Sequence, residues 1–204
     1  MKEDTDPETI FNIAMGAVGG EQITQQHRIC MDDIVLEKIK APEIKPEETG
    51  KNLLTNGDFS DGTSEWGINT NDGQGGQTAT TVVTHGGIVF HVINPGVYDW
   101  DVQLNQHGFT LEKGCKYRVK FKVTSTKART IKLGLMDNNC QKWYGGEDIS
   151  LGEAEEKEVS CEFTMQQDTD NDSNMLISMG KIRDENTPAS DITLTNFSLE
   201  KITE

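Results

Sequence analysis

Apolar side chains recur at every second position in several short segments of this chain, and this period constrains the fold more than any other feature. The segment CKYRVKFKV (115–123) places Cys, Tyr, Val, Phe and Val on one face and Lys and Arg on the other. Similar strand-like runs are RTIKLGL, KEVSCEF and SDITLTNFSLE, separated by clusters of Gly, Asn, Asp and Ser. A period of two is typical of half-buried strands, and no ten-residue segment keeps a helical apolar stripe. The sequence therefore predicts an all-β domain, a β-sandwich of two packed antiparallel sheets.

The chain also contains an internal repeat that is cut short. ICMDDIVLEKI (29–39) resembles ITLTNFSLEKI (192–202), and DTDPETIFNIAMG (4–16) lines up with DTDNDSNMLISMG (168–180) in nearly the same register. Strands and Asp-rich turns resemble one another in many proteins, but the matched spacing favours a true repeat. The predicted organisation is a C-terminal remnant of a preceding repeat (1–40), a Pro- and Glu-containing linker (41–50) and a complete unit (51–204).

The remnant is too small to bury a core of its own. Its strands must pair with the complete unit or with another chain, or remain disordered. The segments 11–16 and 29–39 resemble 175–180 and 192–202 closely enough to compete for the same places in a sheet. The sequence therefore predicts either strand exchange between chains or a disordered N-terminus.

The charge of the chain narrows the range of partners. The formal net charge is −15 at pH 7 and the sequence pI is about 4.6, so phosphate backbones and anionic membrane surfaces are repelled. Neutral polysaccharides are not repelled by this charge. The chain has no apolar run of the roughly 20 residues that a membrane span needs. MKEDTDPETI lacks the apolar core of a signal peptide, so any export signal is expected outside this chain.

Four cysteines stand at positions 30, 115, 140 and 161, with no CxxC pair and no His at metal-ligand spacing. This spacing argues against a zinc site. Cys115 and Cys161 fall on the apolar faces of their predicted strands, which favours buried thiols that behave as small hydrophobic residues. A disulfide remains the alternative.

Four segments of the chain follow one another in the same order as similar segments in a known protein family. NLLTNGDFSDGTSEW, NPGVYDWDVQLNQ, LEKGCKYRVKFKV and ITLTNFSLEKI follow one another as they do in carbohydrate-binding modules of the family 4/9 type, which are related to the family 22 xylan-binding modules. The resemblance covers 51–203, and the tail of a second copy covers 4–39. It implies a β-jelly roll and a cleft for one glycan chain. It also implies a non-catalytic role, attached to an extracellular or cell-surface polysaccharide-degrading enzyme.

Glycan clefts need exposed aromatic rings for the apolar faces of sugars and amides or carboxylates for their hydroxyls. The resemblance points to Trp100 as a ring that faces the glycan and to Gln103 as a polar contact, with Asn105 beside it. In DNNCQKWYGG (137–146) two adjacent aromatics in a polar loop indicate that at least one is exposed, and Trp143 is favoured over Tyr144. Tyr98 is a third candidate. Trp66 and Tyr117 are expected in the core.

Trp100 presents a conflict between pattern and resemblance. Strict alternation would bury Trp100 with Val102 and Leu104 and would leave Asp101 with Gln103 and Asn105 in the cleft. A bulge or a strand edge at 99–100 would resolve the conflict by letting Trp100 face the ligand.

The resemblance also raises the question of a structural Ca²⁺, because the family often carries one. The usual ligand positions hold Ser60 and Thr195 here, and Asp58, Asp61 and Asp191 are nearby carboxylates that could substitute for them. The segment DTDNDSNMLISM lacks the Gly and Glu of a calcium loop, so an Asp/Asn turn is the better interpretation. No cofactor is required by the function that the resemblance implies.

No catalytic signature is present: the sequence lacks a G-x-S-x-G elbow, an H-E-x-x-H motif and a P-loop. The main hypothesis is a binding module for single chains of β-linked glucan or xylan that targets a linked glycoside hydrolase. The alternative is a spacer or adhesion jelly roll that binds no sugar. The low aromatic content of 6% and the altered calcium positions favour this alternative.

Overall fold

The computed structural model describes residues 50–84, 86–183 and 187–202. The chain divides into two units, Met1–Lys45 and Pro46–Glu204, and all described residues belong to the second. The predicted remnant at 1–40, the predicted linker up to residue 49, and Cys30 lie outside the described residues. Within the described ranges, no helix has the length and apolar character of a membrane span.

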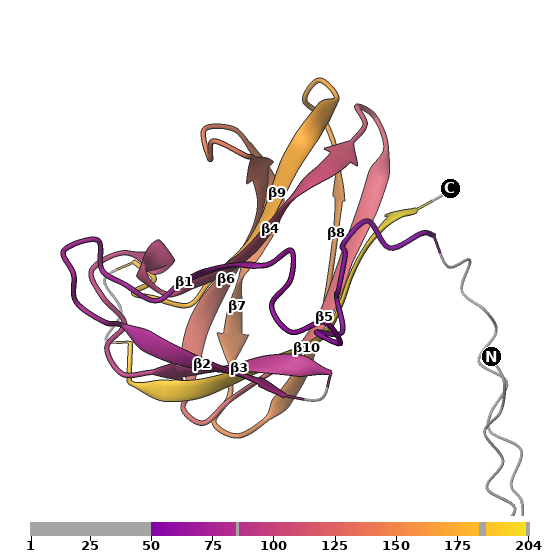
Figure 1. Ribbon diagram of the computed structural model, residues 1–204. Coiled ribbons are helices and arrows are strands. Elements are labelled where there is room, and N and C mark those ends of the chain that lie inside the picture. The colour runs from indigo at the N-terminus through magenta and orange to yellow at the C-terminus, as the bar shows by residue number, and fades with distance from the viewer. Residues whose placement is uncertain (1–49, 85, 184–186, 203–204) are drawn as a thin grey trace, which may run out of the picture. The chain divides into compact units, whose positions relative to one another are not determined.

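The described part of the chain forms two five-stranded antiparallel sheets (Figure 1), which confirms the predicted β-sandwich. The first sheet, in spatial order, contains β1 (Gly67–Asn69), β4 (Gln103–Leu111), β9 (Asp170–Ser178), β6 (Arg129–Asp137) and β7 (Trp143–Leu151). The second contains β2 (Ala79–Thr84), β3 (Gly87–Val92), β10 (Ser190–Ile202), β5 (Lys116–Ser125) and β8 (Glu156–Thr164). A single turn of 3-10 helix, η1 (Asp99–Asp101), precedes β4.

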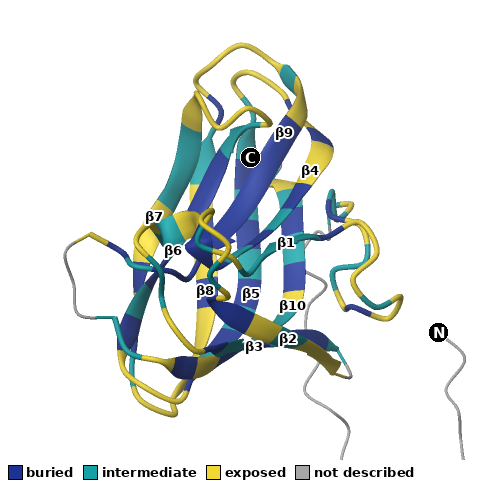
Figure 2. Cartoon of the chain, turned by 60° about the vertical axis from the view of Figure 1, so that its left-hand side comes forward, coloured by how far each residue is buried: buried dark blue, intermediate teal, exposed yellow. Residues whose placement is uncertain are grey.

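The core lies between the two sheets and follows the period-two pattern. Along β5 every second residue is buried, from Tyr117 to Ser125, and the buried and partly exposed bands alternate along this strand in Figure 2. Tyr117 is 1% exposed, as expected. Such alternation arises because successive side chains of a strand point to opposite faces.

Trp66 is also a core residue, as predicted. Its ring stacks on Phe59 with centroids 5.1 Å apart and lies 5.0 Å from the ring of Phe197. Its indole N–H donates to the carbonyl oxygen of Asn56 at 2.9 Å. The polar atom of this buried Trp is therefore satisfied, which makes burial of the whole ring favourable.

β10 contains one irregularity that the alternating pattern alone does not show. Ile192 and Leu194 are buried, and the next buried apolar residues are Phe197 and Leu199, so the phase shifts by one residue. The pairing of β10 with β5 jumps between Thr195 and Ser198, and Asn196 has a φ of 58°. Asn tolerates this left-handed conformation better than most residues. The resulting bulge returns the second half of the strand to the core.

Candidate functional site

The η1 turn places Trp100 on the outside of the sandwich. Asp101 is 2% exposed, and its Oδ2 accepts hydrogen bonds from the backbone N–H groups of Val97 (2.7 Å) and Tyr98 (2.9 Å). The hydroxyl of Thr78 donates to the carbonyl oxygen of Asp101 at 2.6 Å. Because Asp101 is held inward, the preceding Trp100 points outward and is 52% exposed. β4 begins only at Gln103, so the alternation of the strand does not include Trp100.

The segment after β9 stabilises this turn through backbone hydrogen bonds. The backbone N–H of Gly180 donates to the carbonyl oxygen of Asp99 at 2.9 Å, and that of Lys181 donates to Tyr98 at 3.2 Å. A Cβ at position 180 would collide with the carbonyl oxygens of Tyr98 and Pro95. The absence of a side chain at Gly180 therefore allows the turn to sit close to the sheet.

Trp143 is the first residue of β7. It is 44% exposed, and its ring rests over Gly134 of β6. A Cβ at position 134 would lie 3.0 Å from Cζ3 of Trp143 and 2.9 Å from Cδ1 of Leu176. Gly134 thus leaves room for the indole ring to lie across β6.

Lys132 contacts both the η1 turn and the ring of Trp143. Its Nζ lies 3.2 Å from Oδ2 of Asp99 in the η1 turn and 5.7 Å from the ring centroid of Trp143. The ion pair is partly shielded, since the side chains are 36% and 19% exposed. The two charges neutralise each other within the site, and the cation contacts the electron-rich face of the indole.

Trp100, Trp143 and Lys132 line a groove of about 390 Å³ on the outer face of the first sheet. Its lining combines exposed aromatic rings, apolar side chains, neutral polar groups and the one ion pair, from Asn69, Asp99, Trp100, Gln103, Lys132, Met136, Cys140, Trp143, Leu176 and Ser178. A ligand with apolar faces and hydroxyl groups would find aromatic stacking surfaces and amide groups in this lining.

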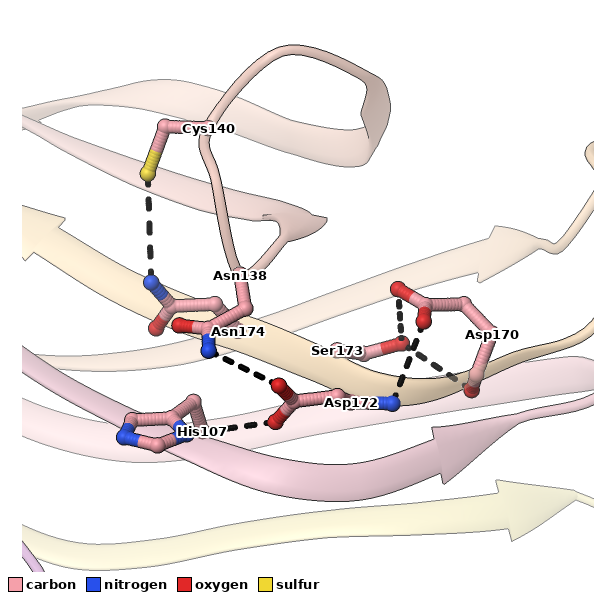
Figure 3. Close-up of polar contacts among 7 residues, drawn as sticks. All are labelled: His107, Asn138, Cys140, Asp170, Asp172, Ser173 and Asn174. Atoms are coloured by element: carbon pink, nitrogen blue, oxygen red, sulfur yellow. Dashed lines mark hydrogen bonds and ion pairs between the residues drawn. The ribbon is translucent and has the colours of Figure 1, made fainter.

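The loop between β6 and β7 makes polar contacts with β9 (Figure 3). Cys140 lines the groove, and its Sγ lies 3.9 Å from Nδ2 of Asn174 on β9. Asn138 of the same loop donates to Oδ2 of Asp172 at 2.8 Å, and Nδ1 of His107 lies 3.2 Å from Oδ1 of this carboxylate. The contacts from His107 and Asn138 hold the pKa of Asp172 below its usual value. The loop is therefore attached to β9 by polar contacts on its outer side.

The family model for the carbohydrate binding domain CBM_4_9 matches residues 51–190. The chain belongs to this carbohydrate-binding module family. Modules of this family are non-catalytic binding modules.

Solved structures show the same fold at low sequence identity. A structure titled "CBM4 structure and function" aligns with a TM-score of 0.60 and 20% identity, covering 72% of this chain and 99% of that one. The second N-terminal cellulose-binding domain of Cellulomonas fimi β-1,4-glucanase C aligns with a TM-score of 0.59 and 15% identity, covering 76% and 97%. The first such domain of that enzyme gives 0.55 and 18%, covering 72% and 94%. No curated protein sequence matches the chain.

The predicted site residues of the module occupy different places. Trp100, Gln103 and Trp143 line the groove. Nε2 of Gln103 donates to Oγ of Ser178 at 3.0 Å. Asn105 is not a lining residue of the groove, and its Nδ2 donates to Oε1 of Gln103 at 3.4 Å. Tyr98 stacks on Trp100, with centroids 4.6 Å apart and the ring planes inclined by 8°.

Tyr144 lies apart from the groove, although it follows Trp143 directly. It packs against the core, and its hydroxyl donates to Oδ2 of Asp170 at 2.9 Å. Burial, together with the contact to Asp170, raises the pKa of Tyr144 to about 12. The two adjacent aromatics point to opposite faces of β7, as the period of a strand requires.

The alternating pattern was wrong for Asp101, which it placed in the cleft beside Gln103. The structure buries Asp101 because its carboxylate satisfies two backbone N–H groups of the turn. Three further residues that line the groove, Asn69, Lys132 and Ser178, were not predicted from the sequence. The sequence places them only at outward-facing positions of their strands. Their proximity depends on the pairing of strands that are distant in sequence.

The residues at and near the usual calcium positions form contacts within the protein. Ser60 donates from its backbone N–H and its hydroxyl to Oδ1 of Asp58, at 3.1 and 2.8 Å, and Asp191 pairs with His91 at 2.9 Å. Among the described residues no three side chains of His, Cys, Asp or Glu are grouped so that they could hold a metal ion. The cysteines at 115, 140 and 161 are free thiols.

Proposed function

We propose that this module binds single chains of neutral β-linked polysaccharide, β-glucan or xylan, in the groove between Trp100 and Trp143. The observation that carries the proposal is that two half-exposed Trp rings, Trp100 and Trp143, line the same groove as the amide of Gln103. Stacking would supply affinity and the amide would fix the orientation of the sugar hydroxyls.

The charges of the module favour a neutral ligand. Asp99 and Lys132 are the charged residues that line the groove, and they pair with each other. The chain as a whole carries a net charge of −15, which repels polyanions. The aligned Cellulomonas fimi domains are named cellulose-binding domains of a glucanase, which supports a β-linked glycan as the ligand class.

The biological role that we propose is targeting. A binding module joined to an extracellular or cell-surface glycoside hydrolase keeps the enzyme near its substrate, because each rebinding event is intramolecular and has a high effective concentration. No cofactor is needed for this role.

Affinity gel electrophoresis tests the site. We expect soluble β-glucan or xylan in the gel to retard the module, and Trp100→Ala or Trp143→Ala to weaken binding by at least about tenfold through loss of a stacking surface. Val82→Ala is a matched control, because Val82 is 50% exposed on β2 of the other sheet. Unchanged retardation of both Trp variants would show that the groove is not the binding site.

The second candidate function is a spacer or adhesion domain that binds no sugar. The low aromatic content and the altered calcium positions, Ser60 and Thr195, favour it. A glycan array that contains β-glucans, xylans and β-galactans distinguishes the two, since a spacer gives no hits.

A further inference from the structure

A second hollow lies on the far side of Trp100 from the groove. Its volume is about 370 Å³, and it is formed by the loop 71–74 together with Asn69, Tyr98, Trp100 and Asp101. Hollows of roughly 300 to 1,000 Å³ are the usual size of small-molecule sites. Asn69 and Trp100 line both the groove and this hollow, so the two adjoin at these residues.

The loop that forms the hollow has a fixed shape. Oδ1 of Asp72 accepts hydrogen bonds from the backbone N–H groups of Gln74 (2.9 Å) and Gly76 (2.8 Å), which lowers the pKa of this carboxyl. The N–H of Asp72 donates to the carbonyl oxygen of Gly76 at 3.0 Å. Gly73 has a φ of 72°, a conformation that glycine adopts without strain. The tip of the loop therefore presents Gln74 to solvent in a defined position.

Asn69 joins this loop to the aromatic turn. Its Nδ2 donates to the carbonyl oxygen of Trp100 at 2.7 Å and to that of Asn71 at 3.3 Å. Tyr98 and Trp100 are stacked and about equally exposed, at 51% and 52%. Stacking buries the facing sides of the two rings, and the apolar surface that stays exposed forms an aromatic platform of the kind on which a sugar ring can stack.

We propose that the glycan-binding surface of the module continues past Trp100 into this hollow. The occupant is the same neutral β-linked chain, which rests on Tyr98 and forms hydrogen bonds with Gln74. The inference depends on the proposed function, since the chain must first occupy the groove. The hollow adds binding energy only for ligands long enough to reach it, so the module distinguishes long chains from short oligosaccharides.

Calorimetric titration with cellotriose and cellohexaose, and in parallel with xylotriose and xylohexaose, tests this extension. We expect Tyr98→Ala to weaken binding of the hexasaccharide by about fivefold more than binding of the trisaccharide. For Gln74→Ala we expect this difference to be about threefold. Tyr98→Phe retains the ring and should restore the preference for length. Gln77→Ala is the matched control, since Gln77 is an exposed residue of the same loop outside the hollow.

The outcomes separate this inference from the proposed function. Equal losses for short and long ligands in Tyr98→Ala would mean that Tyr98 only supports Trp100, and would overturn the extension. Unchanged binding of the hexasaccharide in both variants would overturn it as well. In either case binding in the groove stands. If the wild-type module binds none of the four oligosaccharides and none of the polysaccharides, the proposed function fails and the extension fails with it.

Discussion

Asp101 is the residue on which the position of Trp100 depends most directly. Its buried carboxylate holds the backbone of Val97 and Tyr98 and so shapes the turn that carries the aromatic ring outward. Hydrogen bonds to a charged group contribute more than neutral ones, and buried N–H groups left without a partner are costly. Asp101 is therefore a positioning residue for Trp100.

Replacement of Asp101 by Ala is expected to destabilise the module by about 2 kcal/mol and to weaken glycan binding by about fivefold, because the turn loses two hydrogen bonds. Chemical unfolding and calorimetric titration measure the two effects. Asp101→Asn keeps one acceptor oxygen and should recover much of the affinity.

Ile88→Val serves as a control for Asp101→Ala. Ile88 is fully buried in β3 of the other sheet, and its truncation is expected to lower stability by about 1 kcal/mol. If Ile88→Val weakens glycan binding as much as Asp101→Ala does, general destabilisation explains the loss and Asp101 has no specific effect on the groove.

At the scale of elements, the groove depends on how β6 and β7 pair. Gly134 of β6 pairs with Gly146, and Met136 pairs with Trp143 across a shift in register. Lys132, Gly134 and Met136 share the outward face of β6, so the middle position of this row has no side chain. The indole of Trp143 occupies the space that a side chain at position 134 would fill.

Gly134→Val is therefore expected to displace Trp143 and Leu176. Overpacking of this kind destabilises by about 1 to 3 kcal/mol, and loss of the stacking surface should weaken glycan binding by about tenfold. Thr130→Val is the matched control, because Thr130 lies on the same face of β6 outside the groove. Wild-type affinity in Gly134→Val would show that the space over this glycine is not needed for binding.

At the scale of the whole molecule, stability in alkali depends on buried phenols. The pKa of Tyr144 is about 12 in the folded module, against about 10 for a solvated phenol. Because the folded state binds this proton more tightly, Tyr144 contributes stability that is complete below about pH 10 and is lost as the pH rises toward about 12. Burial lowers the pKa of Arg129 to about 10, which acts in the opposite direction over the same range.

Tyr144→Phe removes the contribution of Tyr144 and leaves that of Arg129. We expect the stability of Tyr144→Phe to fall less than that of the wild type between about pH 9 and about pH 11. Urea unfolding at the two pH values measures the difference. Parallel losses in both proteins would mean that the hydroxyl of Tyr144 is not protected by its contact with Asp170.

Much of the fold was predictable from the sequence, because a period of two marks each strand without knowledge of its partners. The inward residues of β5 and the burial of Trp66 follow from local pattern and resemblance. The bulge at Asn196 is a different case: the apolar pattern changes phase between Leu194 and Phe197, but only the pairing with β5 shows that a bulge between Thr195 and Ser198 absorbs the change. The predicted strand exchange and tandem repeat involve residues 1–40, outside the described residues, and stay predictions.

The site was predictable only in part. Trp100, Gln103 and Trp143 line one groove, but Trp100 faces it because a 3-10 turn interrupts the approach to β4. Nothing in the local sequence shows that Asp101 caps that turn. Lys132 and Ser178 approach Gln103 through strand pairing across the sheet, and such non-local pairing is not written in the period of any single strand.

The capped η1 turn has a consequence for which ligands the module prefers. Asp101, Asn69 and Gly180 hold the aromatic wall in place without help from a ligand. On binding, the loss of conformational freedom therefore falls almost entirely on the sugar chain. Chains with few accessible linkage conformers lose less entropy than flexible ones and are bound more tightly for the same contacts. In the binding mode that we propose, a rigid wall of this kind would select for stiffness of the polymer as well as for its chemistry.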